Sequence, residues 1–313
     1  MSFSSTTKSE LARIIPLKKC CCEAELVSFW QVNGAGVSGS GKKRALKFNS
    51  ENAAVARKIF RLAKGLLGTK PRIYVSKRSS FKKNNIYTVY APVGAGMADE
   101  GSIASFGQCC TVGHPGSGME SCCRKSYLRG SFLAGGSIAN PHRTYHMEVT
   151  VPGSMLADML VNLMRAYGLK PGITLRKTLH IVYLKESEQI AHFLNIVGAH
   201  SALLQFENIR IYKGMRNRVN RLVNCETANM NKSINAALEQ IENIRLIQAY
   251  MGLGKLPKNL RLIAALRLEN PEASLKELGE MLDPPIGKSG VNHRMRKIEE
   301  VAERFREKRV REE

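Results

Sequence analysis

The stretch Tyr127-Leu128-Arg129-Gly130-Ser131-Phe132-Leu133-Ala134-Gly135-Gly136-Ser137-Ile138 decides the fold expected for this chain. It combines apolar and small residues in a helical pattern and ends at glycine, where a left-handed helix cap is easiest. The pair Cys122-Cys123 precedes it, and a fainter copy runs from Cys21-Cys22 through Leu26 to Gly34. Self-similarity of this kind predicts an internal duplication.

Each copy is followed by the same order of elements. In the first half, Ser50 is expected to cap a helix that ends near Gly65 or Gly68, with strands at 72–75 and 85–90. Its inward face is marked by apolar residues at helical spacing, namely Val55, Ile59, Leu62 and Leu66.

The second half repeats this order. Its expected elements are a helix at 155–167, strands at 173–176 and 179–184, and a closing helix at 188–197. Ser154 is expected to cap the first of these helices and Gly168 to end it. Helices and strands in this order predict an α+β fold with antiparallel sheets in both halves.

After about Glu207 the strand signals stop, and the remainder is helical in pattern. The expected domains are therefore a first half at 1–110, a second half at 111–207, a helical linker at 208–250 and a C-terminal domain at 251–313.

The charge of the chain points to a polyanionic partner. It has 48 Lys and Arg against 26 Asp and Glu, a formal net charge of +22. Between Lys42 and Lys83 there are 14 basic residues and a single acid, Glu51. Strand alternation places a subset of this region on one sheet face, where it would track phosphates. The candidates are Lys42, Lys43, Arg44, Lys47, Arg72, Tyr74, Lys77, Arg78, Lys82 and Lys83. The alternative is a solvated basic surface with no partner.

The C-terminal domain has the pattern of a helix-turn-helix. Ser274-Leu275-Lys276-Glu277 predicts a capping box, and Asp283-Pro284-Pro285 stops that helix. A second helix is expected from about Ser289, with Leu260 to Leu268 as a supporting helix. The inward stripe of the second helix is Val291, Met295, Ile298, Val301 and Phe305.

A basic N-terminal end is typical of a recognition helix in the major groove. The candidate DNA-binding residues are Ser274, Lys276, Lys288, Ser289, Asn292, His293, Arg294, Arg296 and Lys297. Asn and Arg suit base edges, and Lys and Ser suit phosphates. Residues 230–313 carry 16 basic and 13 acidic residues, so this prediction depends on pattern rather than net charge. A helical hairpin with merely solvated charges is the alternative.

The stretch from Tyr127 to Ile138 resembles the LAGLIDADG helix of homing endonucleases, with Gly130, Ala134 and Gly136 at the motif's small positions. Together with the strings at 216–229 and 288–294, the whole chain resembles the WhiA family of bacterial regulators. The resemblance implies a single-chain, pseudo-twofold LAGLIDADG-type domain of helices and antiparallel sheets, followed by an all-α helix-turn-helix. It also implies transcriptional control of cell division, chromosome segregation and sporulation.

The chain departs from the nuclease pattern where cleavage would need acids. Homing enzymes of this type place a metal-binding carboxylate at the end of each motif helix, and those positions are Asn33 and Gly135 here. Hard cations need oxygen ligands, preferably charged, so we expect no enzymatic activity and no catalytic residues. We expect Gly130, Ala134 and Gly136 to permit close packing of the two helices instead.

The eight cysteines are Cys20, Cys21, Cys22, Cys109, Cys110, Cys122, Cys123 and Cys225. Because there is no C-x-x-C, we expect buried reduced thiols, no metal site and no cofactor. His114, between Cys110 and Cys122, keeps a zinc site open as a weaker alternative.

Three functional hypotheses follow. The first is a sequence-specific regulator of transcription on double-stranded DNA. The second is a residual nuclease or RNA maturase with acids drawn from Asp99, Glu120 or Glu148. The third is an interaction scaffold whose nuclease-like domain binds a protein or small ligand while only the C-terminal domain touches DNA. Charge reversal at Arg72, Lys77 and Arg78 would then leave DNA affinity and its salt dependence unchanged.

We expect a monomer in the cytoplasm, associated with the nucleoid. Residues Met1 to Lys19 contain no apolar signal-peptide core, and no segment is long and apolar enough for the membrane. An RNA polymerase sigma factor or another regulator stays open as a further partner.

Overall fold

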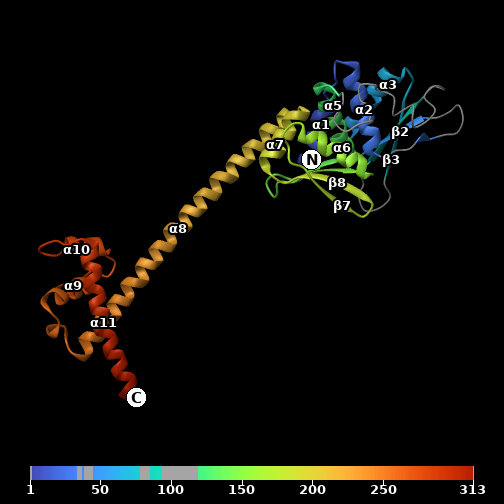
Figure 1. The fold of residues 1–313 in the computed structure, drawn as a ribbon. Coiled ribbons are helices and arrows are strands. Elements are labelled where there is room, and N and C mark those ends of the chain that lie inside the picture. The colour runs from blue at the N-terminus through green and yellow to red at the C-terminus, as the bar shows by residue number, and fades with distance from the viewer. Residues whose placement is uncertain (1, 34–36, 39–44, 78–84, 94–118, 313) are drawn as a thin grey trace. The chain divides into compact units, whose positions relative to one another are not determined.

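A computed structural model describes residues 2–33, 37–38, 45–77, 85–93 and 119–312. The chain divides into two compact units, Met1–Gly214 and Met215–Glu313 (Figure 1). The boundary lies inside helix α8 (His200–Tyr250). The four domain boundaries expected from the sequence remain a prediction.

The first unit contains two copies of one arrangement of helices and strands. The first copy consists of α2 (Lys19–Asn33), β1 (Val37–Ser38), β2 (Ala45–Ser50), α3 (Ala53–Leu67), β3 (Arg72–Lys77) and β4 (Asn85–Pro92). The second consists of α5 (Ser121–Gly135), β5 (Gly136–Ile138), β6 (Met147–Val151), α6 (Ser154–Arg165), β7 (Gly172–Arg176) and β8 (Leu179–Leu184). Helix α1 (Phe3–Leu11) precedes them and α7 (Ser187–Val197) follows them.

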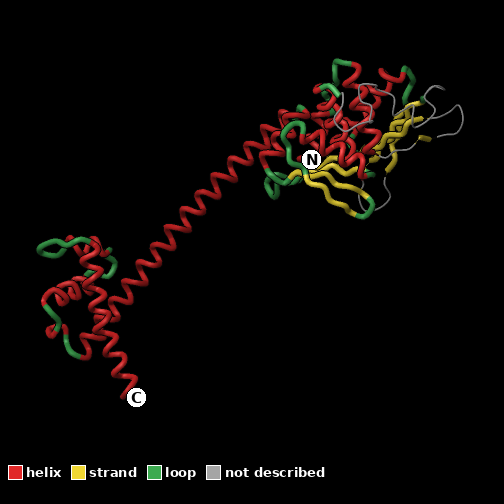
Figure 2. The backbone as a smooth tube through the Cα atoms, viewed as in Figure 1, coloured by secondary structure: helices red, strands yellow, loops and turns green. Residues whose placement is uncertain are grey.

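The two sheets have the same topology. All strand pairs are antiparallel, in the orders β1-β2-β4-β3 and β5-β6-β8-β7. The strands of this unit lie on one side and its helices on the other (Figure 2). This confirms the expected α+β duplication with antiparallel sheets.

The caps of three helices differ from those expected. Asn52, not Ser50, caps α3, because Ser50 is still paired with Tyr87 in the sheet. Gly153 occupies the N-cap position of α6, and Ser154 is its first helical residue. At the end of α5, Gly136 has extended backbone rather than a left-handed cap, and it begins β5. The errors at Ser50 and Gly136 concern where a neighbouring strand ends or begins.

Helices α2 and α5 form the central seam of the first unit. A Cβ atom on Gly130 would overlap both the Oγ atom of Ser28 and the backbone carbonyl oxygen of Glu25. The glycine therefore permits the close approach of α5 to α2, as expected from its place in the motif. Gly136 is tight for another reason, because its Cβ would meet Phe132 of the preceding helix, α5.

A buried ion network lies beside this seam. Glu25 forms an ion pair with Lys58 of α3, and both side chains are 0% exposed. The Glu25 carboxylate also meets Arg129 of α5 at 3.4 Å. Lys58 donates to the carbonyl oxygen of Leu11 at 2.9 Å, and Arg129 donates to that of Val197 at 2.8 Å. Burial raises the pKa of Glu25 and lowers the pKa of Lys58, because desolvation disfavours both charged forms.

The second unit is helical in its described residues. It contains the C-terminal part of α8, the 3₁₀ turn η3 (Leu253–Lys255), α9 (Lys258–Glu269), α10 (Leu275–Glu280) and α11 (Lys288–Glu312). Its core brings together Ile244 and Ile247 of α8, Ile263 of α9 and Leu278 of α10. Along 214–236 the side chains of α8 are exposed, so this stretch contributes to neither core. Within the described residues, we find no helix with the length and apolar character that a membrane span requires.

Candidate nucleic-acid interface

Local interactions that the sequence encodes hold the three helices α9, α10 and α11 together. Ser274 and Glu277 form the expected capping box at the start of α10. The buried Arg267 guanidinium donates to the carbonyl oxygen of Ala273 at 2.6 Å, which fixes the turn between α9 and α10. A Cβ atom on Gly279 would overlap the carbonyl oxygen of Ile286, so glycine is required where the chain turns toward α11.

Helix α11 has one buried face, as expected. Val291, Met295 and Ile298 are buried, while Val301 and Phe305 are half-buried against the same core. The helix begins at Lys288, one residue before the expected start.

The predicted DNA-binding residues of the helix-turn-helix lie on or beside the exposed surface. Those with exposed side chains are Ser274, Lys276, Lys288, Ser289, His293, Arg296 and Lys297. Asn292 and Arg294 are half-buried on the first two turns of α11. Lys276 reaches Glu280 at 3.7 Å, and Ser274 accepts the Glu277 backbone N–H, so both side chains already have partners within α10.

The register of the first sheet determines which predicted basic residues share a face. Lys47 and Arg72 both pair with Tyr90, and Tyr74 is two residues from Arg72 along β3. These side chains therefore lie on the face opposite the buried Phe48 and Val89. Tyr74 and Tyr90 make an edge-to-face contact there, with ring centroids 5.3 Å apart.

Lys77 has the opposite parity to Tyr74 and belongs to the core side of the sheet, at the end of its strand. The expectation of one shared face is therefore wrong for Lys77. Six other candidates lie outside the described residues, namely Lys42, Lys43, Arg44, Arg78, Lys82 and Lys83.

The second sheet does not repeat this basic face. At the corresponding place, Glu148 of β6 meets His146 at 3.2 Å, and the His146 ring stacks on Tyr183 of β8. Lys185 lies over the Tyr183 ring at 4.9 Å. The two halves share a fold, but their outer sheet faces differ in chemistry.

The C-terminal ends of α2 and α5 hold the positions where homing enzymes carry acids. The Asn33 side chain donates to the carbonyl oxygen of Asn49 at 3.1 Å and accepts its backbone N–H at 2.9 Å. It thereby satisfies both backbone groups of one residue on β2, which a carboxylate cannot do because it has no donor. At Gly135, any Cβ would overlap the carbonyl oxygen of Thr150 and lie 2.7 Å from Val32.

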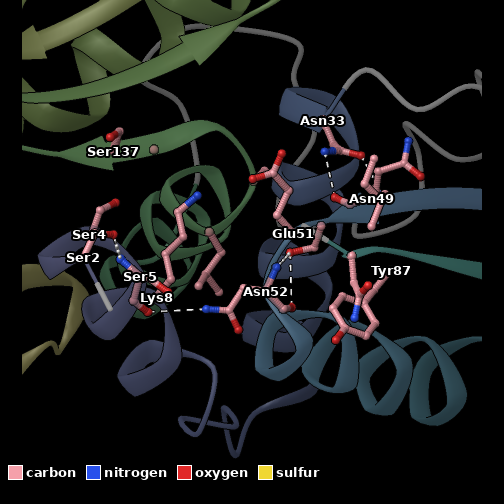
Figure 3. A pocket seen from close by; sticks show the side chains of 16 residues that line it. Ser2, Ser4, Ser5, Lys8, Asn33, Asn49, Glu51, Asn52, Tyr87 and Ser137 are labelled. Carbon is pink, nitrogen blue, oxygen red and sulfur yellow. Dashed lines mark hydrogen bonds between the residues drawn. The ribbon is translucent and has the colours of Figure 1, made fainter. Parts of the chain in front are cut away.

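A polar cavity of about 1050 Å³ opens beside these helix ends (Figure 3). Asn33, Lys8 and Glu51 are among the residues that line it, and Glu51 is the only carboxylate among its described lining residues. Burial lowers the pKa of Lys8 to about 8, although the nearby Glu51 carboxylate opposes this shift. Within the described residues, this cavity offers one acid rather than the pair that metal-assisted cleavage uses.

The structure also brings together cysteine thiols whose proximity was not predicted from the sequence. The residues of α2 and α5 correspond at an offset that pairs Cys20-Cys21 with Cys122-Cys123. The sequence match aligned Cys21-Cys22 instead and missed this correspondence. Counting back from Asn33 and Gly135 to the first turn of each helix would have found it. His114 lies outside the described residues.

These features define the class of protein: a duplicated LAGLIDADG-like domain with a helix-turn-helix domain after it. The WhiA N-terminal LAGLIDADG-like domain matches residues 19–97, the WhiA LAGLIDADG-like domain matches 124–216, and the WhiA C-terminal HTH domain matches 219–302. The chain belongs to the WhiA family.

Similar proteins support this assignment over the full length. The "probable cell division protein WhiA" of Desulforamulus reducens is 50% identical, across 98% of this chain and 97% of its own. That of Heliobacterium modesticaldum is 49% identical, across 97% of both chains. The crystal structure of full-length WhiA from Thermatoga maritima is 28% identical and matches with a TM-score of 0.59, over 97% of this chain and 99% of its own.

Proposed function

We propose that this protein is a sequence-specific DNA-binding regulator of transcription that acts in cell division, and that its LAGLIDADG-like domain is catalytically inactive. The observation that carries the proposal is the basic, exposed start of α11, which lies on the surface of a domain matched by the WhiA HTH model. The role in cell division is supported by the names of the relatives.

In this proposal α11 is the recognition helix. Its buried stripe fixes the helix against α9 and α10, so the opposite side can enter a major groove without loss of the core. Asn292 and Arg296 are one helical turn apart and carry the side chains that pair best with adenine and guanine. Lys288, Ser289 and Lys297 would contact phosphates.

The outer face of the first sheet supplies a second, sequence-independent contact. Lys47 and Arg72 flank Tyr90 on that face, and neutralised phosphates would make binding strongly dependent on salt. On the second sheet Glu148 takes the place that Lys47 has on the first, so the proposal assigns this contact to the first half of the duplicated domain.

The chain carries its own pseudo-twofold repeat, so the proposal requires no second copy of the protein. We propose that the protein binds chromosomal DNA.

We expect Arg296→Ala and Asn292→Ala each to reduce preference for the target sequence by about 1–3 kcal/mol, because each would remove a bidentate base contact. Target sites are first selected from randomised duplex DNA with the wild-type protein. Affinities for target and random duplexes are then compared at one fixed salt concentration.

Arg304→Ala is the matched control, since Arg304 is exposed on the same helix two turns further on. It should leave the preference for the target unchanged. Wild-type preference in both Arg296→Ala and Asn292→Ala would contradict the assignment of α11.

We expect no Mg²⁺-dependent cleavage of DNA by the pure protein, because Asn33 and Gly135 are committed to backbone packing. The three other acids considered do not supply the missing pair of carboxylates. Glu120 stands at the N-cap position of α5, at the far end of the helix, Glu148 meets His146, and Asp99 lies outside the described residues. Supercoiled plasmid incubated with Mg²⁺ or Mn²⁺ should remain intact. Cleavage that disappears in Glu148→Gln would instead support the nuclease hypothesis.

A further inference from the structure

Four cysteine thiols meet where the N-terminal ends of α2 and α5 come together. The sulfur atoms of Cys20, Cys21, Cys122 and Cys123 all lie within 4.8 Å of one another. None of the four is in a disulfide. Cys21 and Cys123 are buried, whereas Cys20 and Cys122 are half-buried, so the cluster has an inner and an outer side.

The cluster follows from the duplication itself. Each helix contributes two adjacent cysteines from its first turn, and the pseudo-twofold relation of the helices brings the two pairs face to face. Adjacent cysteines on one chain are poor zinc ligands alone, but two such pairs on separate helices supply four thiolates around one point. The absence of a C-x-x-C motif therefore does not exclude a tetrathiolate site.

The spacing of the sulfur atoms fits one metal ion. A tetrahedral zinc ion with Zn–S bonds of about 2.3 Å needs sulfurs about 3.8 Å apart, which small side-chain movements within a cluster of this size can reach. A four-iron cluster binds each thiolate through a different iron atom, which requires wider separation of the ligands. Soft thiolate ligands also select against Mg²⁺ and Ca²⁺.

We propose that Cys20, Cys21, Cys122 and Cys123 form a structural tetrathiolate site for a single Zn²⁺ ion, which joins the N-terminal ends of the two motif helices. The site would be closed, since four protein ligands complete the tetrahedron and leave no position for water or substrate. Its role is to hold the helix seam together.

The helix ends oppose part of the charge of such a site. Zn²⁺ with four thiolates carries two negative charges, and the ligands stand in the first turns of two helices, whose dipoles are positive at that end. The Glu120 carboxylate lies beside the site, where it accepts from the Cys122 thiol at 3.3 Å, and Lys18 lies 4.0 Å from that carboxylate.

Metal binding must displace protons from these thiols. A cysteine thiol carries a proton, and only the thiolate is a metal ligand. Each ligand releases one proton as its Zn–S bond forms, and zinc affinity therefore falls as the pH is lowered.

The proposal is tested with the full-length protein purified without chelators under reducing conditions. Elemental analysis should find one zinc ion per chain. After removal of zinc, titration with Co²⁺ should give the visible d–d and thiolate charge-transfer bands of a tetrahedral tetrathiolate site, and Zn²⁺ should abolish them. Zinc should also raise the Tm of the metal-free protein.

Cys21→Ser and Cys123→Ser should reduce the zinc content by more than half and lose the Co²⁺ spectrum. Cys22→Ser and Cys225→Ser are the matched controls and should retain both. Cys22 donates to the Pro16 carbonyl oxygen at 3.2 Å, outside the cluster, and Cys225 is exposed on α8.

The Co²⁺ titration uses wild-type protein, so it decides the question even if a variant fails to fold. No stoichiometric zinc together with no tetrathiolate Co²⁺ spectrum would overturn the proposal, as would equal zinc content in all four variants.

Discussion

Replacing Glu25 with alanine is expected to lower the free energy of unfolding by about 3–5 kcal/mol, the cost of leaving a buried charge without its partner. In the native protein the Glu25 carboxylate meets both Lys58 and Arg129. Without it, the fully buried Lys58 ammonium is left with a neutral acceptor, the Leu11 carbonyl oxygen at 2.9 Å. Urea denaturation of the variant and the wild-type protein measures the difference.

The loss of stability in Glu25→Ala should depend on pH, and the direction of this dependence can be predicted. Burial already lowers the pKa of Lys58, and removal of the Glu25 charge lowers it further. Between this pKa and the higher pKa of Lys58 in the wild-type protein, the native variant has lost the Lys58 proton, whereas the native wild type and both unfolded chains still hold it. Stability of Glu25→Ala relative to wild type should therefore rise with pH across this window.

An exposed ion pair supplies the control. The carboxylate of Glu188 lies 3.8 Å from Arg210, with 84% of the Glu188 side chain exposed, so Glu188→Ala should change stability little. The double variant Glu25→Leu, Lys58→Met should be more stable than Glu25→Ala, because it removes the unpaired ammonium. Equal losses for Glu25→Ala and Glu188→Ala would show that the buried network does not hold the seam.

Gly130→Ala should lower the free energy of unfolding by about 3 kcal/mol, the upper part of the usual range for an overpacked core. The added methyl group would overlap Ser28 and the Glu25 backbone, so α2 and α5 would have to separate. Thermal and urea unfolding measure the loss.

Two comparisons make this result specific. Gly65 is an exposed helical glycine of α3 with no atom within 4 Å of an added Cβ, so Gly65→Ala should stabilise the protein by about 0.5–1 kcal/mol. Ser28→Ala should not rescue Gly130→Ala, because the overlap with the Glu25 carbonyl oxygen remains. A double variant with wild-type stability would show that the helix backbones are not in close approach.

Much of the fold could be predicted because its signals are local. Strand β8 was expected with the bounds it has, and the capping box at Ser274 forms as the four residues indicate. The buried stripe of α11 follows from its helical spacing. Such features depend on neighbours a few residues away, which a single segment of sequence contains.

The Ser50 cap was wrong because a helix cap depends on where the preceding strand stops. Ser50 is a good capping residue, but its pairing with Tyr87 keeps it in β2 and transfers the cap to Asn52. Strand pairing brings together residues 37 positions apart, here Ser50 and Tyr87, and local propensity does not include that competition.

By itself, the sequence determined the duplication, the order of helices and strands, the helix-turn-helix pattern and the WhiA family, because periodicity, caps and motifs are properties of single segments. Only the tertiary structure decided which side chains meet. It paired Cys20-Cys21 with Cys122-Cys123, placed Glu25 against Lys58, and separated Lys77 from the face of Arg72 and Tyr74. Contacts of this kind depend on helix packing and strand register, which join segments that lie far apart along the chain.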